Sequence, residues 1–184
     1  MRIFENESFE KQETLNQGEY DNCTFKNCSF SEQDLSNFTF IECTFEHCDL
    51  SSAKVNDTSF KDVRFLHCKL LGINFSACNP FLLSLHFEYC MLNYASFYQL
   101  KLAKMEIRNC MLEEVDFSET VLPGTNFIEC DLRGAMFDQT NIEKADFTTS
   151  VNYSIDPEAN RIRKAKFSRE GVIGLLAKYD LIIV

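Results

Sequence analysis

The residues best suited to chemistry in this sequence are histidines, and two of the three lie beside cysteines. His47 precedes Cys48, and His67 precedes Cys68 at a distance of 20 residues. Imidazole and thiolate are both zinc ligands, so these pairs suggest a His/Cys metal site. The repeat pattern described below, however, points the cysteines inward and the histidines outward, which spoils a tetrahedral ligand set. We therefore predict no metal ion and no cofactor.

Other catalytic signatures are also missing from the sequence. Only six glycines occur, and no Gly-rich phosphate loop with its lysine is present. A Ser/His/Asp set can be assembled on paper, but nothing in the repeat would bury it or shift its pKa values. We expect a protein that binds rather than catalyses.

Apolar residues recur at every fifth position and must set the framework of the chain. One register runs from Tyr20 to Phe75, and a second runs from Leu82 to Phe147 after two extra residues at Cys78-Asn79. A period of five fits neither a helix (3.6) nor a simple strand (2). A fixed short period over this length is typical of a solenoid.

Small residues occupy the position two before each apolar centre, and cysteines dominate there. Each five-residue unit would thus point one large and one small side chain inward, and four units would close a square coil of 20 residues. The spacing 20-20-22-20-20 absorbs the two extra residues and predicts that six cysteines stack in one inward column: Cys28, Cys48, Cys68, Cys90, Cys110 and Cys130. The centres Leu92, Leu112 and Leu132 belong to one face, and Phe97, Phe117 and Phe137 to the next.

Units such as Ala145-Asp146-Phe147-Thr148-Thr149 and Cys130-Asp131-Leu132-Arg133-Gly134 resemble the pentapeptide repeat, A(D/N)LXX. The resemblance covers residues 18–149 well and 150–169 loosely. It implies an all-β fold, a right-handed quadrilateral parallel β-helix of seven to eight coils. We expect an N-terminal lead-in or cap over 1–17, the β-helix over 18–169 with a bulge at 78–79 and an irregular segment at 150–160, and a C-terminal segment over 170–184.

The C-terminal segment is predicted to form a short helix and an apolar strand. Ser168 can cap a helix beginning near Arg169, and an apolar stripe follows with helical spacing at Val172, Leu175, Leu176 and Tyr179. Four apolar residues end the chain and exceed what an end cap needs: Leu181, Ile182, Ile183 and Val184. A repeat rod with such an end is similar to the Qnr-type quinolone-resistance proteins, and the resemblance implies a homodimer formed through this end. Those proteins carry longer loops than the two-residue bulge here.

Composition suggests a cytoplasmic protein without a membrane span. The sequence has no apolar stretch of 18 residues and no N-terminal apolar run. Eight of the nine cysteines take the small inward position, where a free thiol acts as a small hydrophobe. We interpret them as reduced and structural, as expected in the cytoplasm.

Charge gives the main indication of function. The chain carries −10, and residues 1–160 alone hold 12 bases and 26 acids. If eight coils rise about 4.8 Å each, the rod spans about 38 Å, over which duplex DNA carries about 22 charges. Direct nucleic-acid binding is excluded by the sign of the net charge, whereas mimicry of nucleic acid is compatible with it.

The acids concentrate on two adjacent faces, which we call the acidic faces, centred on the Leu92/Leu112/Leu132 and Phe97/Phe117/Phe137 columns. Lys54, Lys69 and Arg133 are the bases there, and ten acids oppose them: Glu32, Asp34, Asp49, Asp57, Glu113, Glu114, Asp116, Glu119, Asp131 and Asp138. Such faces would attract a basic, DNA-binding groove. Combined with the resemblance, this predicts a DNA mimic that binds a type II topoisomerase (DNA gyrase or topoisomerase IV), with Glu113, Glu114, Asp116, Glu119, Asp131 and Asp138 as the candidate partner surface.

The alternative is a repeat scaffold that binds another protein. Phe81 and Leu83 flank the centre Leu82 and either point outward near the bulge, as a contact site, or Phe81 folds inward. The sequence does not identify the partner.

Overall fold

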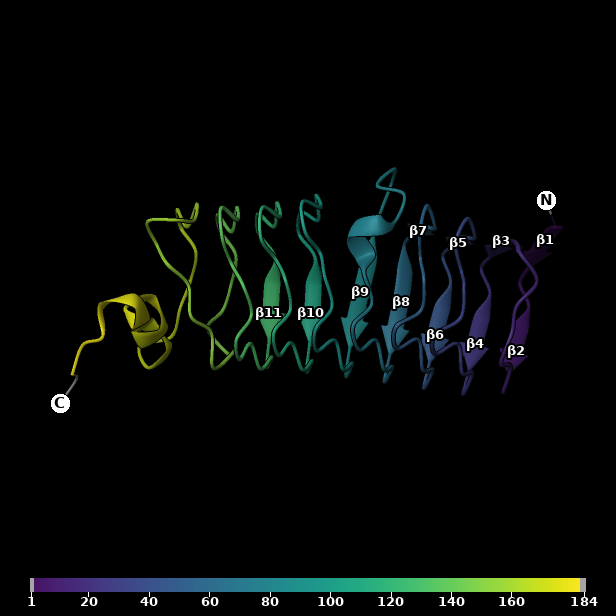
Figure 1. Cartoon of the computed structure of the whole chain (residues 1–184), viewed down its shortest axis with the longest axis horizontal. Coiled ribbons are helices and arrows are strands. Elements are labelled where there is room, and N and C mark those ends of the chain that lie inside the picture. The colour runs from purple at the N-terminus through teal and green to yellow at the C-terminus, as the bar shows by residue number, and fades with distance from the viewer. Residues whose placement is uncertain (1, 183–184) are drawn as a thin grey trace.

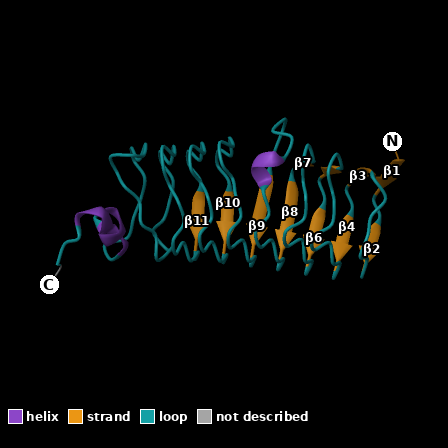
Figure 2. Ribbon diagram, in the orientation of Figure 1, coloured by secondary structure: helices purple, strands orange, loops and turns teal. Residues whose placement is uncertain are grey.

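The computed structural model describes residues 2–182 and shows a rod of stacked parallel coils with one terminus at each end (Figure 1). Short strands and turns account for almost all of it, and helical turns occur at one bulge and at the C-terminal end (Figure 2). The strands are β1 (Arg2–Glu5), β2 (Ser8–Glu10), β3 (Gly18–Asp21), β4 (Thr24–Lys26), β5 (Thr39–Ile41), β6 (Thr44–Glu46), β7 (Ser59–Lys61), β8 (Val63–Leu66), β9 (Leu85–Glu88), β10 (Glu106–Arg108) and β11 (Asn126–Ile128). The predicted all-β parallel β-helix is confirmed.

Two parallel sheets form neighbouring faces of the rod. One has the order β1-β3-β5-β7 and the other β11-β10-β9-β8-β6-β4-β2. The seven strands of the longer sheet span about six turns, slightly fewer than the seven to eight coils expected. The difference arises because the C-terminal coils continue through single bridges, such as Asn126 to Asp146 and Asp146 to Lys166, rather than through strands.

The predicted register holds across the two-residue insertion. Phe45 pairs with Phe65, and Phe65 pairs with Phe87, 22 residues later. Their rings stack with centroids 5.1 and 5.4 Å apart. The residues that follow the six column cysteines are bridged from coil to coil, including Lys69 to Met91, so the single inward cysteine column is confirmed.

The cysteine column is hydrogen-bonded as well as packed. All nine cysteines are free and buried. In the column, a thiol donates to the carbonyl of a core centre one coil earlier, as Cys68 Sγ does to Phe45 O at 3.3 Å and Cys130 Sγ does to Ile107 O at 3.4 Å. Burial raises the pKa of the Cys130 thiol to about 11 and that of Cys43 to about 12. The thiols therefore stay protonated at neutral pH.

The insertion corrects one sequence prediction. A 3₁₀ turn, η1 (Phe75–Ala77), leads into a loop that projects from the rod (Figure 1). Leu82 was expected as an inward centre, but it is 64% exposed, and Phe81 beside it is 68% exposed. Leu83 packs against the core instead. Two extra residues do not simply shift the register; they lengthen the chain between Cys78 and Leu85, so the surplus is pushed outward.

The C-terminal segment closes the rod. Ser168 Oγ accepts the Gly171 N–H at 2.8 Å, as predicted for a cap. The helix itself is not α-helical: it consists of two 3₁₀ turns, η2 (Gly171–Leu175) and η3 (Ala177–Tyr179). A Cβ at Gly174 would stand 2.2 Å from the Tyr153 carbonyl oxygen, so the segment packs closer than any other side chain would permit.

The predicted terminal strand is not formed at Leu181 or Ile182, and Ile183 and Val184 lie outside the described residues. At the other end, β1 and β2 lie within the expected lead-in and pair in register with β3 and β4. No helix within residues 2–182 is long and apolar enough to cross a membrane.

Candidate functional site

The six acids of the candidate partner surface lie together on neighbouring coils. Asp131 is bridged to Met111, and Asp116 to Met136. The Glu114 N–H donates to Arg133 O, and the Glu119 N–H donates to Asp138 O. All six side chains are accessible to solvent. The repeat thus brings residues 113–138 into one continuous acidic surface, because a step of 20 residues is a step of one coil.

The acids of this surface are held mainly by neutral donors. Asn93 Nδ2 donates to Glu113 Oε2 at 3.2 Å, and Gln99 Nε2 donates to Glu119 Oε2 at 2.7 Å. Tyr98 Oη donates to Glu119 Oε1 at 3.0 Å, and this hydrogen bond raises the pKa of Tyr98. These contacts fix the carboxylates in place without cancelling their charge.

Two of the acids have additional roles in the fold. Asp116 Oδ1 accepts the Ser118 N–H at 2.8 Å. Asp131 receives a hydrogen bond from Asn152 at 2.8 Å, and its other oxygen lies 3.7 Å from the Arg133 guanidinium. Within residues 2–182, this is the one ion pair that any of the six acids forms.

Large apolar side chains stand among these acids, which the sequence analysis missed. Tyr94 is 58% exposed, Tyr98 37%, Met111 45% and Met136 49%. Met111 and Met136 are the bridge partners of Asp131 and Asp116. Tyrosine and methionine are enriched in protein interfaces, whereas ordinary surface favours neither. The signal was present in the sequence as Tyr and Met at outward repeat positions.

The two corner histidines do not form a metal site with cysteines. His47 and His67 stack with ring centroids 4.8 Å apart, and Tyr89 continues the stack at 4.8 Å from His67. Cys48 and Cys68 are buried on the other side of the backbone. Among residues 2–182, no three His, Cys, Asp or Glu side chains are grouped as metal ligands would be.

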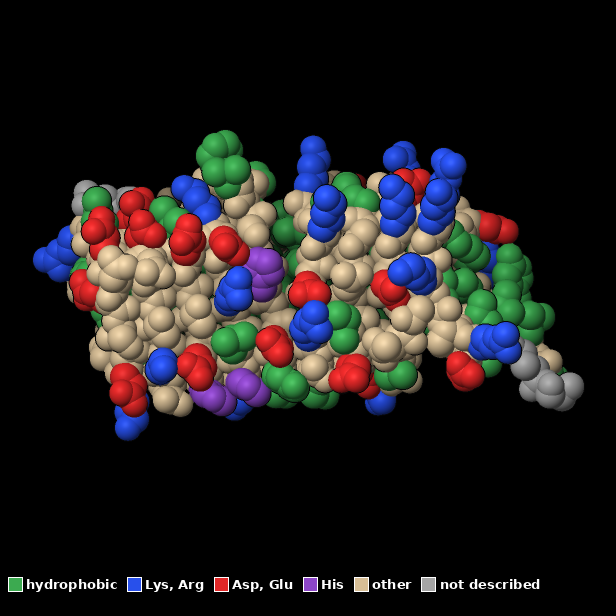
Figure 3. Space-filling model, turned by 180° about the vertical axis from the view of Figure 1, so that it is seen from behind, with side chains coloured by type: hydrophobic (Ala, Val, Ile, Leu, Met, Phe, Trp, Pro, Cys, Tyr) green, Lys and Arg blue, Asp and Glu red, His purple; other side chains and the backbone are tan. Residues whose placement is uncertain are grey.

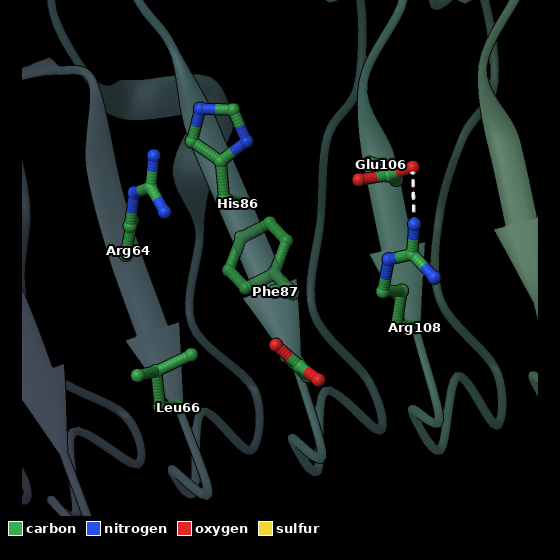
Figure 4. Close-up of a pocket in the computed structure, with 7 residues that line it drawn as sticks. Arg64, Leu66, His86, Phe87, Glu106 and Arg108 are labelled. Atoms are coloured by element: carbon green, nitrogen blue, oxygen red, sulfur yellow. Dashed lines mark hydrogen bonds and ion pairs between the residues drawn. The ribbon is translucent and has the colours of Figure 1, made fainter.

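A shallow depression of about 220 Å³ lies on the outer surface of the longer sheet (Figure 4). Its charged groups are largely paired: Arg108 lies 2.7 Å from Glu106, and His86 lies 2.9 Å from Asp62. Ligand pockets usually measure about 300–1,000 Å³. This depression is smaller and is filled by its own ion pairs, so it is a weak candidate for a substrate site.

The candidate dimerisation residues lie in an exposed apolar segment, to the extent that they are described. Leu181 is 57% exposed and Ile182 is 93% exposed. In the preceding turns, Leu175 packs against the core, while Val172, Ile173 and Leu176 remain exposed. The apolar stripe is therefore only partly used to close the rod.

Comparisons with known proteins identify the repeat. Residues 19–97 and 38–117 match the family described as "Pentapeptide repeat region", and residues 110–148 match "Pentapeptide repeats (8 copies)". No curated protein matches the chain.

Solved structures of QnrB1, described as a plasmid-mediated fluoroquinolone resistance protein, are similar along the whole chain. The full-length form is 19% identical with a TM-score of 0.66, covering 98% of this chain and 100% of QnrB1. A trypsin-treated variant is 20% identical with a TM-score of 0.65, covering 99% of this chain and 98% of that one. At this identity the similarity establishes the fold.

Proposed function

Because the chain belongs to the pentapeptide-repeat family, we propose that it is a non-catalytic binding protein whose acidic faces occupy the DNA-binding surface of a type II topoisomerase. The observation that carries this proposal is the continuous acidic surface at residues 113–138, where Arg133 is the one base. Fixed carboxylates along a rod present charge as a phosphate backbone does. The likeness to QnrB1, a fluoroquinolone resistance protein, supports the choice of partner class. Such a partner places the protein in the cytoplasm.

The test is binding to DNA gyrase and its supercoiling activity, with and without a quinolone. The informative variant is Glu113→Lys/Glu114→Lys/Glu119→Lys, which changes the surface by six charge units. Asp116 is left in place because it accepts the Ser118 N–H. The matched control is Glu10→Lys/Glu88→Lys/Glu129→Lys, which alters three glutamates on or beside the longer sheet that form no ion pair within the described residues.

We expect the first variant to lose binding and the control to weaken it modestly, with both effects reduced by salt because exposed charges act over about 8 Å at physiological ionic strength. Equal effects would refute the assignment to the acidic faces. If wild-type protein binds no topoisomerase at low salt, the second candidate function remains: a scaffold for another protein. The exposed side chains of Phe81 and Leu82 favour that alternative.

We further propose a homodimer formed through the C-terminal apolar segment. Exposed Leu181 and Ile182 support it. Deletion of residues 181–184 should give a monomer in sedimentation at about 500 mM salt, where apolar contacts persist and ionic contacts are screened. A full-length chain that is already monomeric at micromolar concentration would exclude this contact.

A further inference from the structure

One edge of the rod changes sign at its middle. The segments that precede β4, β6, β8, β9, β10 and β11 all lie on this edge, because these strands are parallel neighbours in one sheet. We call it the leading edge. Its N-terminal half holds Lys61 and four acids: Glu19, Asp21, Glu42 and Asp62. Its C-terminal half holds Glu143 and six bases: Lys101, Lys104, Lys144, Arg161, Arg163 and Lys164.

The bases of the C-terminal half are not neutralised within the chain. None of the six forms an ion pair among the described residues. All six are exposed, and Lys101 and Arg161 are linked coil by coil through Val121 and Asn141. Figure 3 shows the Lys and Arg side chains projecting in a row along this half of the edge, and the acids gathered towards the other half. The net charges of the two halves are −3 and +5.

The projecting loop stands at the point where the sign changes. It follows the coil of Asp62 and precedes β9, and its segment 83–86 borders a depression shared with Lys101 and Lys104. Phe81 and Leu82 at its tip are the hydrophobic side chains that protrude from this edge in Figure 3. Lone exposed apolar residues are ordinary, but two at the tip of a loop on a charged edge mark a contact.

A half-acidic, half-basic edge with an apolar centre is complementary to itself when turned end over end. A two-fold axis through the loop places the acidic half of one copy against the basic half of another, and brings the two apolar tips together. This is the isologous geometry of a symmetric dimer, in which one patch serves both partners. A bilayer or a nucleic acid would match only the basic half and would be repelled by the acidic one.

We propose that a second copy of this chain binds along the leading edge in antiparallel orientation, with Phe81 and Leu82 of the two copies in contact. Individual exposed ion pairs are weak, so the association depends on the whole edge and on the apolar tips. It is independent of the topoisomerase proposal, because Glu113, Glu114 and Glu119 lie on the acidic faces. It also differs from the C-terminal contact, which is apolar and resists salt.

The test is sedimentation velocity of the chain lacking residues 181–184, at about 50 and about 500 mM salt, where the Debye length falls well below 10 Å. We expect dimers at low salt that dissociate at high salt. A basic-half variant, Lys104→Glu/Lys144→Glu/Lys164→Glu, should be monomeric at both. Glutamate suits these positions, since all three have positive φ and Glu42, Glu114 and Glu129 adopt the same conformation. An acidic-half variant, Glu19→Lys/Asp21→Lys/Glu42→Lys, should also be monomeric; Asp62 is spared because it pairs with His86.

Mixing the two variants is the decisive measurement. One then has an acidic edge throughout and the other a basic edge, so the mixture should form heterodimers at low salt that neither variant forms alone. Misfolding of either variant cannot produce this rescue. Phe81→Ser/Leu82→Ser should weaken dimerisation at least tenfold with an unchanged fold. A monomeric parent at low salt, a mixture that stays monomeric, or binding to anionic vesicles or duplex DNA without self-association would overturn the proposal.

Discussion

Between Ser29 and Asn74, the bridged outward positions of the acidic faces hold only small, polar or charged residues, whereas between Met91 and Met136 the same positions also hold methionine. Tyr94 and Tyr98 belong to this second region too, and both are exposed. The interior does not change in the same way, since large and small buried residues alternate through both regions. Core packing therefore fixes the inward residues of every coil, while binding is free to select the outward residues of some coils and not others.

The largest expected effect tests the shared interior. Phe117 is fully buried, and its ring stacks on Phe97 and Phe137 with both centroid distances 5.2 Å. Phe117→Ala should lower the free energy of unfolding by about 3–5 kcal/mol, because the rings above and below cannot collapse into the cavity. Chemical denaturation measures this value. Met136→Ala, an exposed residue one coil away, is the control and should cost under about 0.5 kcal/mol. A loss under about 1 kcal/mol for Phe117→Ala would contradict the stacked column.

The next effect concerns the closure at the C-terminal end. Gly174→Ala places a Cβ 2.2 Å from the Tyr153 carbonyl oxygen, which also adjoins the Ile155 N–H bond to Gly174 O. Backbone must shift, so we expect a loss of about 1–3 kcal/mol and faster amide exchange at Ile155. Gly124→Ala is the matched control: its Cβ would meet only Lys104 Cγ at 3.8 Å, although its positive φ adds strain. Unchanged exchange at Ile155 would mean that the close approach is not maintained.

The contrast between the inside and the outside of the rod also explains what the sequence could predict. The inward positions obey one rule, so the coil, the column of six cysteines and the register from Phe65 to Phe87 follow from spacing alone. The projection of Leu82 does not follow, because a two-residue insertion can be placed at several points of a coil. The 3₁₀ form of Gly171–Leu175 depends on contact with Tyr153, which is distant in sequence.

The candidate surface was predictable only in its charge. Acids at outward repeat positions can be assigned to faces from the period, and the structure places all six together. Recognising Tyr94 and Met136 as part of the same surface requires knowing that they are exposed, since Tyr and Met equally suit a core. The sign change of the leading edge was hidden for a different reason: net charge sums over the two halves and loses their opposition.

A smaller effect separates the two regions of the acidic faces. Tyr94→Ser/Met136→Ser should weaken binding of the topoisomerase partner about tenfold, because a buried aromatic or methionine contact contributes about 1–2 kcal/mol, and this loss should persist at high salt. The equivalent change in the first region, Lys54→Ser/Asn74→Ser, should have little effect. Isothermal titration calorimetry at two salt concentrations distinguishes them. Equal losses in both regions would remove the distinction between them.

The smallest effect should be the same in both halves, because it arises in the shared interior. Cys43 in the first half has its pKa raised to about 12 by burial, and Cys130 in the second to about 11, both from 9.0. A raised pKa means that the folded protein holds the proton more tightly than the unfolded chain does. The stabilisation is therefore complete below pH 9 and is lost as pH rises towards 12. We expect Tm to be flat from pH 7 to about 8.5 and to fall above it. Because Tyr20 and lysines titrate in the same range, the informative comparison is with Cys43→Ala/Cys130→Ala. Alanine occupies equivalent inward positions at Ala53 and Ala95, so the variant should fold and show a shallower fall at alkaline pH. An identical slope in the two proteins would show that thiol ionisation does not contribute.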